Sequence, residues 1–378
     1  MGNSHVLPDH VRLIANDRTW IEGRAVEQLI GVGNLAHVKR VVGLPDLHPG
    51  RGYPVGAAVL TEGAIYPALV GNDIGCGMGL WRTDCKASKA RPEKWIRRLA
   101  DIDAPLGPDW RDEVAAAKGS LGLPTVGDDA AMGTIGGGNH FAELQALDAI
   151  VDETASSELG LDPAVLYLLV HSGSRGLGQA ILSGHLRDHG HNSLTPDMPD
   201  FDRYRTDHDR AMHWAAANRR MIAARIMEAV RGDAVPLLDV THNMVEPAGA
   251  GLWLHRKGAS PTNRGPVMIP GSRGDHSYLV LPLDASASLD TVAHGAGRKW
   301  ARADCKARLS GRYRASELKR TKLGSHVLCE DRELLYEEAP EAYKPADSVV
   351  EALVDAGLVR VIARFRPVLT VKRGGGCG

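Results

Sequence analysis

Five side chains that can bind a metal ion follow apolar runs or glycine clusters in this sequence: Asp73, Cys76, His140, His171 and His242. They offer a carboxylate, a thiolate and imidazoles, a mixture that suits first-row transition metals better than Mg²⁺ or Ca²⁺. Five ligands exceed one closed tetrahedral site, but they fit a pair of ions about 3.5–4 Å apart bridged by Cys76. A single histidine or cysteine after a strand is usually a buried core residue. The hypothesis of a two-metal site therefore depends on all five side chains lying close together in the fold.

Glycine-rich turns with the pattern of anion-binding loops recur beside these positions. They are GGGN at 136–139, GSRG at 173–176, PGSRG at 270–274 and HGAGR at 294–298. Successive backbone N–H groups in such turns bind anions, and an arginine adds a bidentate phosphate contact. One such turn is weak evidence, but together they predict a polyphosphate ligand.

His294 is the most reactive candidate, because it lies beside a Gly-Ala-Gly turn and four residues before a basic stretch. A histidine there could be a general base, a metal ligand or a nucleophile that accepts a nucleotidyl group. The sequence has neither the Lys-x-Asp-Gly pattern of lysine-adenylating ligases nor a Walker A motif.

Short buried strands that end in polar loops would position these residues. Apolar runs predict such strands at 64–70, 164–170 and 234–240, directly before GNDIGCG, HSGSRG and THN. The spacing predicts one long helix over 203–231, stopped by Gly232, a second helix over 347–356 and a strand over 358–371. Strands and helices alternate without a visible boundary, which predicts one large α/β or α+β domain.

The glycine pattern GVGNLA at 31–36 resembles a dinucleotide-binding fingerprint. However, the residues before it have helical spacing, and VVGLPDLH after it is typical of a strand. The fingerprint requires strand, then glycines, then helix, so this order disfavours a Rossmann domain.

Composition narrows the class of protein further. Hydrophobic residues make up 43% and charged residues 24% of 378, which excludes a disordered, collagen-like or coiled-coil chain. No apolar run approaches the roughly 20 residues of a membrane span. The chain opens without a signal-peptide pattern and its five cysteines form no CxxC pair, so we expect a cytoplasmic protein.

The net charge of −1 hides a basic segment at 298–322, where ten Lys or Arg residues face only Asp304 and Glu317. Such a segment is either a solvated helical surface or a strip that follows nucleic-acid phosphates. The sequence alone leaves both interpretations open.

Eight motifs together resemble the RtcB-type RNA-splicing ligases, in the same order and across nearly the whole chain. They are LPDLHPGRG (44–52), VGNDIGCGMG (70–79), GGGNHFAE (136–143), VHSGSRGLG (170–178), THN (241–243), HRKGAS (255–260), IPGSRG (269–274) and AHGAGR (293–298). The resemblance implies one RtcB-like catalytic domain over residues 1–378, with central β-sheets surrounded by helices. It also implies a GTP- and Mn²⁺-dependent enzyme that joins RNA ending in a 2′,3′-cyclic phosphate or 3′-phosphate to RNA with a 5′-hydroxyl.

The resemblance also assigns residue roles. Asp73 and His140 would hold one Mn²⁺, His171 and His242 a second, and Cys76 would bridge them, while His294 would take GMP. The GTP site would comprise Asn139, His140, Phe141, Ala142, Glu143, His242, Asn243, Pro270, Gly271, Ser272, Arg273, Ser277, His294, Gly295, Ala296, Gly297 and Lys372. Phosphates of GTP or RNA would contact Arg175, Lys257 and Arg298.

The sequence departs from the common family pattern in a few places. It has PGSRG where the family usually has PGSMG, so Arg273 adds a charge beside the expected guanine site, and it ends in RGGGCG. The stretch GDHSYLV resembles a divergent branch associated with RNA repair beside a release-factor homologue. The substrate could thus be tRNA or other RNA, and an activator protein or release-factor homologue stays open as a partner. A two-metal phosphoesterase acting on RNA ends is the alternative activity, and a non-catalytic RNA-binding protein a third interpretation.

Overall fold

The computed structural model describes residues 7–123 and 130–372. The opening residues, whose pattern argued against a signal peptide, lie outside these ranges, as does the terminal RGGGCG with Cys377. Within the described ranges, no helix combines the length and the apolar character that crossing a membrane would require.

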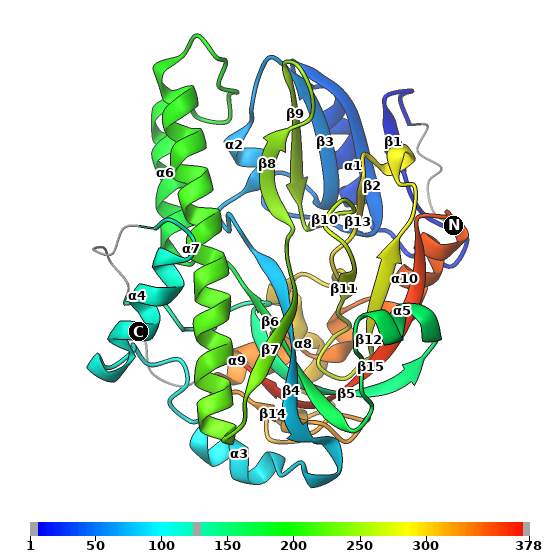
Figure 1. Cartoon of the computed structure of the whole chain (residues 1–378). Coiled ribbons are helices and arrows are strands. Elements are labelled where there is room, and N and C mark those ends of the chain that lie inside the picture. The colour runs from blue at the N-terminus through cyan, green and yellow to red at the C-terminus, as the bar shows by residue number, and fades with distance from the viewer. Residues whose placement is uncertain (1–6, 124–129, 373–378) are drawn as a thin grey trace.

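The larger sheet occupies the lower half of Figure 1 and has the strand order β11-β12-β15-β5-β6-β4-β7, with β14 paired to β15. Its strands are β4 (Gly77–Lys86), β5 (Phe141–Ile150), β6 (Val165–Ser172), β7 (Ala234–Thr241), β11 (Val267–Ile269), β12 (Ser277–Pro282), β14 (His326–Leu328) and β15 (Val359–Val371). All pairs except β14–β15 are antiparallel.

A second sheet, in the upper half of Figure 1, has the order β1-β2-β3-β9-β8. Its strands are β1 (Val11–Leu13), β2 (Val38–His48), β3 (Val55–Glu62), β8 (Asn243–Pro247) and β9 (Leu252–Lys257). A small ladder of β10 (Ala259–Pro261) and β13 (Thr291–Ala293) completes the strands.

Helices flank both sheets, which confirms the predicted α/β (α+β) class. They are α1 (Gly23–Gly33), α2 (Pro67–Val70), α3 (Pro92–Arg98), α4 (Arg111–Gly119), α5 (Glu153–Glu158), α6 (Gly176–His189), α7 (Pro199–Val230), α8 (Arg302–Leu309), α9 (Arg332–Glu337) and α10 (Ala346–Asp355). The glycine pattern at 31–36 overlaps the end of α1 and is followed by β2, and this order confirms that it is not a Rossmann fingerprint.

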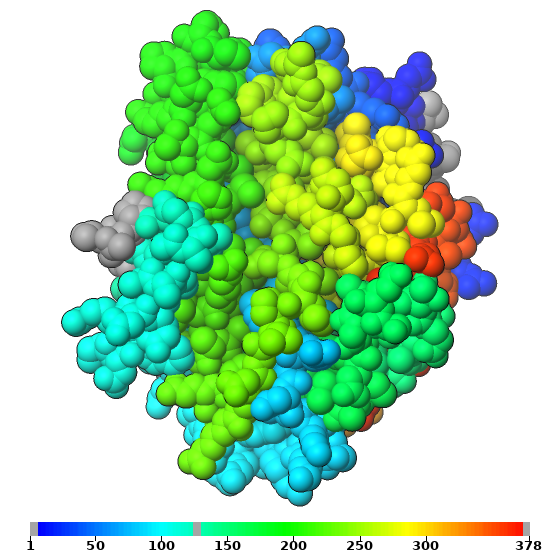
Figure 2. All heavy atoms as spheres, viewed as in Figure 1, coloured from blue at the N-terminus to red at the C-terminus, as the bar shows by residue number. Residues whose placement is uncertain are grey.

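The long helix predicted from sequence is confirmed as α7, which begins four residues earlier than expected, at Pro199. Proline suits the first turn because its missing N–H would have no helical partner there. The helix ends where Arg231 adopts a left-handed conformation (φ 62°) directly before Gly232. The residues Ile222 and Ile226 pack into the core of the larger sheet. Apolar residues of α4 pack against Trp214, and Figure 2 shows the cyan α4 region lying against the green helix.

The strand predicted over 64–70 is wrong. Ile65 makes only an isolated bridge to Leu194, and residues 67–70 form the short helix α2. Pro67 favours this helical turn, and a short buried apolar run cannot by periodicity alone distinguish strand from helix. As a result, Asp73 and Cys76 precede strand β4 rather than follow a strand.

The other predicted elements are confirmed within one or two residues: β6, β7, α10 and β15. The basic segment 298–322 is not one helical surface, because only Arg302–Leu309 is α-helical. Beyond this helix the chain forms turns and a short 3₁₀ helix, and most of its basic residues are exposed.

Candidate active site

Four neighbouring strands of the larger sheet bring the candidate metal ligands together. The strands β5, β6, β4 and β7 are adjacent in that order, and His171 in β6 pairs with Phe141 of β5 and Met78 of β4. Cys76 directly precedes β4, and His242 directly follows β7. All of these side chains therefore reach the same edge of the sheet.

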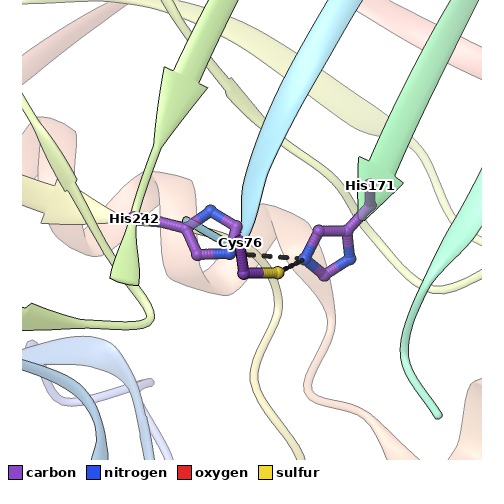
Figure 3. A group of neighbouring side chains, drawn as sticks. All are labelled: Cys76, His171 and His242. Carbon is purple, nitrogen blue, oxygen red and sulfur yellow. Dashed lines mark hydrogen bonds between the residues drawn. The ribbon is translucent and has the colours of Figure 1, made fainter. Parts of the chain in front are cut away.

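The ligand atoms lie within a few ångströms of one another. The Sγ of Cys76 is 3.1 Å from Nε2 of His171 and 3.4 Å from Nε2 of His140. The Nε2 atoms of His171 and His242 are 3.3 Å apart, and Nε2 of His140 is 2.7 Å from the Asp73 carboxylate. Figure 3 shows the side chains of Cys76, His171 and His242 pointing toward one another.

These atoms form two overlapping groups, one of Asp73, Cys76 and His140, the other of Cys76, His171 and His242. In each group the ligand atoms all lie within 4.8 Å of one another, and Cys76 belongs to both. The geometry thus matches the expected pair of sites that share a cysteine.

Electrostatics favour a cation among these donors. Burial, followed by the nearby histidines, holds the pKa values of His171 and His242 well below the usual range, so both imidazoles are neutral. Burial and Asp73 raise the pKa of the Cys76 thiol. Burial works to raise the pKa of Asp73, but the contact with His140 outweighs it and lowers the value to about 2. A neutral imidazole has a free lone pair that can bind a metal ion. The buried thiol of Cys76 needs a nearby positive charge to ionise, and a metal ion would supply it.

His294 forms a buried pair with Asp46, the residue between Pro45 and Leu47 near the end of β2. The imidazole Nδ1 lies 2.6 Å from Oδ2 of Asp46, and the backbone N–H of His294 donates to the same oxygen at 3.2 Å. In the neutral tautomer whose Nδ1–H donates to this carboxylate, Nε2 carries the lone pair. The rings of His294 and His242 are 4.7 Å apart, so this lone pair lies beside the ligand cluster.

Asp46 is a candidate functional residue that the sequence assignment of roles missed. It is completely buried, and its Oδ1 has no hydrogen-bond partner among residues 7–123 and 130–372. The ammonium group of Lys344 donates to the carbonyls of Pro45 and Leu47 at 2.8 Å each, which fixes the backbone on both sides of Asp46. The available signal was a carboxylate inside the otherwise apolar run 41–47, within the LPDLHPGRG motif.

A cavity of about 1070 Å³ joins the ligand cluster, His294 and the glycine turns. Of the expected GTP-site residues, only two do not line it, Ala142 and Ser277, which are buried. Ser277 supports the wall indirectly, since its hydroxyl accepts from Gln145, which also donates to Glu143. Burial raises the pKa of Glu143 to about 7, although Gln145 and Thr370 hydrogen-bond to its carboxylate.

The basic residues that line the cavity differ in how many of their polar atoms already have a protein partner. Lys257 forms no ion pair with any described residue, and burial lowers its pKa to about 8. Arg175 lines the cavity and donates from Nε to Thr134 at 3.3 Å. Arg273 is 6% exposed and donates to the Leu335 carbonyl, while its Nε and Nη1 are buried without partners.

Arg298 is already held by the protein, which the sequence did not reveal. Its guanidinium donates to the Glu338 carboxylate at 3.0 Å and to the Tyr343 hydroxyl at 3.1 Å. Burial favours the neutral acid of Glu338, but Lys372, Arg302 and Arg298 outweigh it and lower the pKa of this carboxyl to about 2. Glu338 and Tyr343 lie in no recognisable motif, so no local signal identified them.

One cavity thus brings together convergent metal-ligand donors, a histidine paired with a carboxylate, and anion-binding turns. These features define a class of enzyme that performs phosphoryl or nucleotidyl chemistry. Comparison with known proteins narrows this class. The family model described as tRNA-splicing ligase RtcB matches residues 28–121 and 125–373. The chain therefore belongs to the RtcB family.

Similar proteins support this assignment. The chain is 51% identical to RNA-splicing ligase RtcB2 of Escherichia coli, over 98% of this chain and 97% of the relative. It is 30% identical to RNA-splicing ligase RtcB of Mycobacterium tuberculosis, over 91% of this chain and all of the relative. It is 28% identical to tRNA-splicing ligase RtcB of Archaeoglobus fulgidus, over 93% and 92% of the two chains. The resemblance drawn from the motifs is confirmed, and the protein is an enzyme of the RNA-ligase class.

Proposed function

We propose that this ligase joins an RNA 2′,3′-cyclic phosphate or 3′-phosphate end to an RNA 5′-hydroxyl end, in RNA repair or tRNA splicing. GTP would supply the energy through a GMP bound to His294, and two Mn²⁺ ions would be the cofactors. The observation that carries this proposal is the Asp46–His294 pair beside the metal-ligand cluster. Hydrolysis of a phosphate ester would not by itself require such an oriented nucleophile.

The proposed metal ligands are Asp73 and His140 for one ion, His171 and His242 for the other, with Cys76 shared. Ions bound there would neutralise phosphate charge and polarise phosphorus–oxygen bonds. The chain orients its own donors for this purpose. Nδ1 of His171 lies 3.1 Å from the Asn139 carbonyl, so its N–H points there and Nε2 faces the cluster. The donors suit a first-row transition metal, and the choice of Mn²⁺ rests on the family resemblance.

His294 would act as the nucleophile. Its Nε2 forms a bond to the α-phosphorus of GTP, and the bond to pyrophosphate breaks. The proton on Nδ1 stays hydrogen-bonded to Asp46, whose negative charge offsets the positive charge that develops on the ring. Where the RNA ends in a 2′,3′-cyclic phosphate, water would first attack its phosphorus and break the bond to the 2′-oxygen, which leaves a 3′-phosphate. An oxygen of the 3′-phosphate then bonds to the phosphorus of GMP, the bond from that phosphorus to Nε2 breaks, and His294 returns to its neutral form. Finally the 5′-hydroxyl attacks the activated phosphorus of the RNA 3′-phosphate, and GMP leaves.

The cavity wall supplies a means to select guanine. As a carboxylate, Glu143 can accept from the N1–H and 2-amino groups of guanine, neither of which adenine has. Lys372 and Arg273 line the same cavity, and the glycine turns offer backbone N–H groups for the phosphates. Lys257, Arg175 and Arg298 stay proposed phosphate contacts, although Glu338 already pairs with Arg298.

A joining assay tests this proposal against its rival. RNA ending in a 3′-phosphate and RNA beginning with a 5′-hydroxyl are incubated with the enzyme and Mn²⁺, with GTP, with ATP or with no nucleotide. We expect joined product with GTP only, and none when the 5′ end carries a phosphate. Loss of the 3′-phosphate without joining and without GTP would instead identify a phosphoesterase. One domain over residues 1–378, a cytoplasmic location and an activator or release-factor partner also stay predictions.

A further inference from the structure

The mouth of the cavity carries an exposed tryptophan that the proposed reaction does not use. All seven tryptophans fall within the described ranges, and Trp20 alone is exposed, at 47%. It lines the same cavity as His294. Tryptophan is well suited to contact a ligand, because its ring offers a large apolar face and an N–H donor.

A short chain of contacts connects Trp20 to the nucleophile. The ammonium group of Lys344 lies over the indole, 6.0 Å from the ring centroid. The same ammonium group donates to the carbonyls on either side of Asp46, and Asp46 pairs with His294. Trp20 is therefore linked through Lys344 to the segment that positions the nucleophile, and it lines the cavity that a substrate bound at His294 would occupy.

Positively charged side chains without an ion-pair partner among the described residues line the same cavity as this aromatic ring. Arg24, Arg51 and Lys299 line the cavity, and none of them makes an ion pair with a residue in the described ranges. Arg24 and Arg51 are exposed. Among the acidic residues that line the cavity, Glu22 is the one that lies between Trp20 and Arg24 in the sequence. Arg24 follows Trp20 by four residues at the start of α1, and Gly50, the neighbour of Arg51, hydrogen-bonds to Gln28 one turn further along that helix. An exposed aromatic ring and arginines in one cavity suit single-stranded nucleic acid, because bases stack on the ring while cations neutralise phosphates.

We propose that Trp20 stacks against a base of the RNA strand near the reacting end, with Arg24 and Arg51 binding its phosphates. This inference rests on the proposed RNA substrate but not on GTP or on a GMP intermediate. Guanine of GTP is the less suitable occupant, because the groups that would recognise it, Glu143 and Lys372, lie deeply buried in the lining whereas Trp20 is exposed.

RNA binding measured without GTP provides the test. Fluorescence anisotropy reports the affinity of the full chain for a labelled 3′-phosphate RNA and for versions with one abasic nucleotide at successive positions from the end. Trp20→Ala should weaken binding of intact RNA about 5- to 150-fold, the range of a lost base–aromatic stack. Trp20→Phe should retain most of the affinity. Leu283→Ala is the matched control, because Leu283 is 46% exposed outside the cavity, and it should change nothing.

The abasic series separates stacking from a general effect on the fold. One abasic position should weaken binding by the wild type yet cause no further loss in Trp20→Ala, since both changes remove the same contact. Replacing Arg24 and Arg51 with alanine should reduce the log–log salt slope by about 0.7 per lost phosphate contact. Unchanged affinity in Trp20→Ala, or additive losses at every abasic position, would overturn the proposal.

GMP labelling of the enzyme without RNA makes the two proposals separable. Trp20→Ala should be labelled at the wild-type rate, and slower labelling would place the ring against GTP instead of RNA and overturn the proposal. If the wild type formed no GMP adduct, the proposed function would fail, while the binding series would still decide the role of Trp20.

Discussion

Replacing Asp46 with asparagine tests the orientation of the nucleophile. Asp46 accepts from both Nδ1 and the backbone N–H of His294, and it is completely buried. An asparagine side chain is nearly the same size as that of aspartate, so Asp46→Asn removes the charge and leaves the packing. A hydrogen bond to a charged group contributes about 1.5–3 kcal/mol. If this stabilisation develops as the imidazole becomes positive, the rate of GMP transfer to His294 should fall about 10- to 150-fold. An amide that turned its NH₂ toward Nδ1 would favour the wrong tautomer and lower the rate further.

Single-turnover formation of the enzyme–GMP adduct measures this rate directly. The control is the sealing of RNA that already carries GMP on its 3′-phosphate, because that step needs no nucleophile from the enzyme. We expect Asp46→Asn to slow adduct formation and to leave sealing within a few-fold of the wild type. An unchanged rate of adduct formation would refute the role of Asp46. An equal loss in both steps would show that Asp46 supports the fold of the cavity and not the nucleophile.

Three further changes test other parts of the site. Cys76→Ser should lose bound metal while its circular dichroism spectrum stays unchanged, because serine is a harder and far less acidic ligand. The control variant Cys85→Ser should keep its metal. Full metal content in Cys76→Ser would contradict a bridging thiolate. Arg273→Met should raise KM for GTP about tenfold without lowering Tm, because two buried nitrogens of the guanidinium have no partner among the described residues and can gain one from the ligand. An unchanged KM would remove Arg273 from the GTP site. Because the pKa of Glu143 is about 7, the fraction of its carboxylate form increases as pH rises from 6 to 8. KM for GTP should therefore fall over that range, and Glu143→Gln should abolish this pH dependence. If the pH dependence persisted in the variant, it would belong to another group.

The sequence predicted that the five candidate metal-ligand side chains converge, because each of them follows a buried apolar run or a glycine-rich motif. Their convergence required β5, β6, β4 and β7 to be neighbours, and that order is not visible in the sequence. The segment 64–70 was misassigned because complete burial removes the periodicity that distinguishes strand from helix.

The functional candidates that the sequence did not identify interact with residues far away along the chain. Asp46 and His294 are 248 positions apart, so no local pattern connects them. Likewise, the HGAGR motif suggested Arg298 as a phosphate contact, whereas the structure pairs it with Glu338, 40 positions away. Local motifs identify donors and turns, but only the folded chain shows which charges are already paired.

The central claim is that His294 carries GMP during the reaction. Incubating the enzyme with α-labelled GTP and Mn²⁺, followed by peptide mapping, measures this most directly. We predict a covalent label that is acid-labile and alkali-stable, as expected for a histidine phosphoramidate, and that maps to His294. The His294→Ala variant should take no label but should still seal RNA that already carries GMP. Label on another residue, or undiminished label in His294→Ala, would contradict the account.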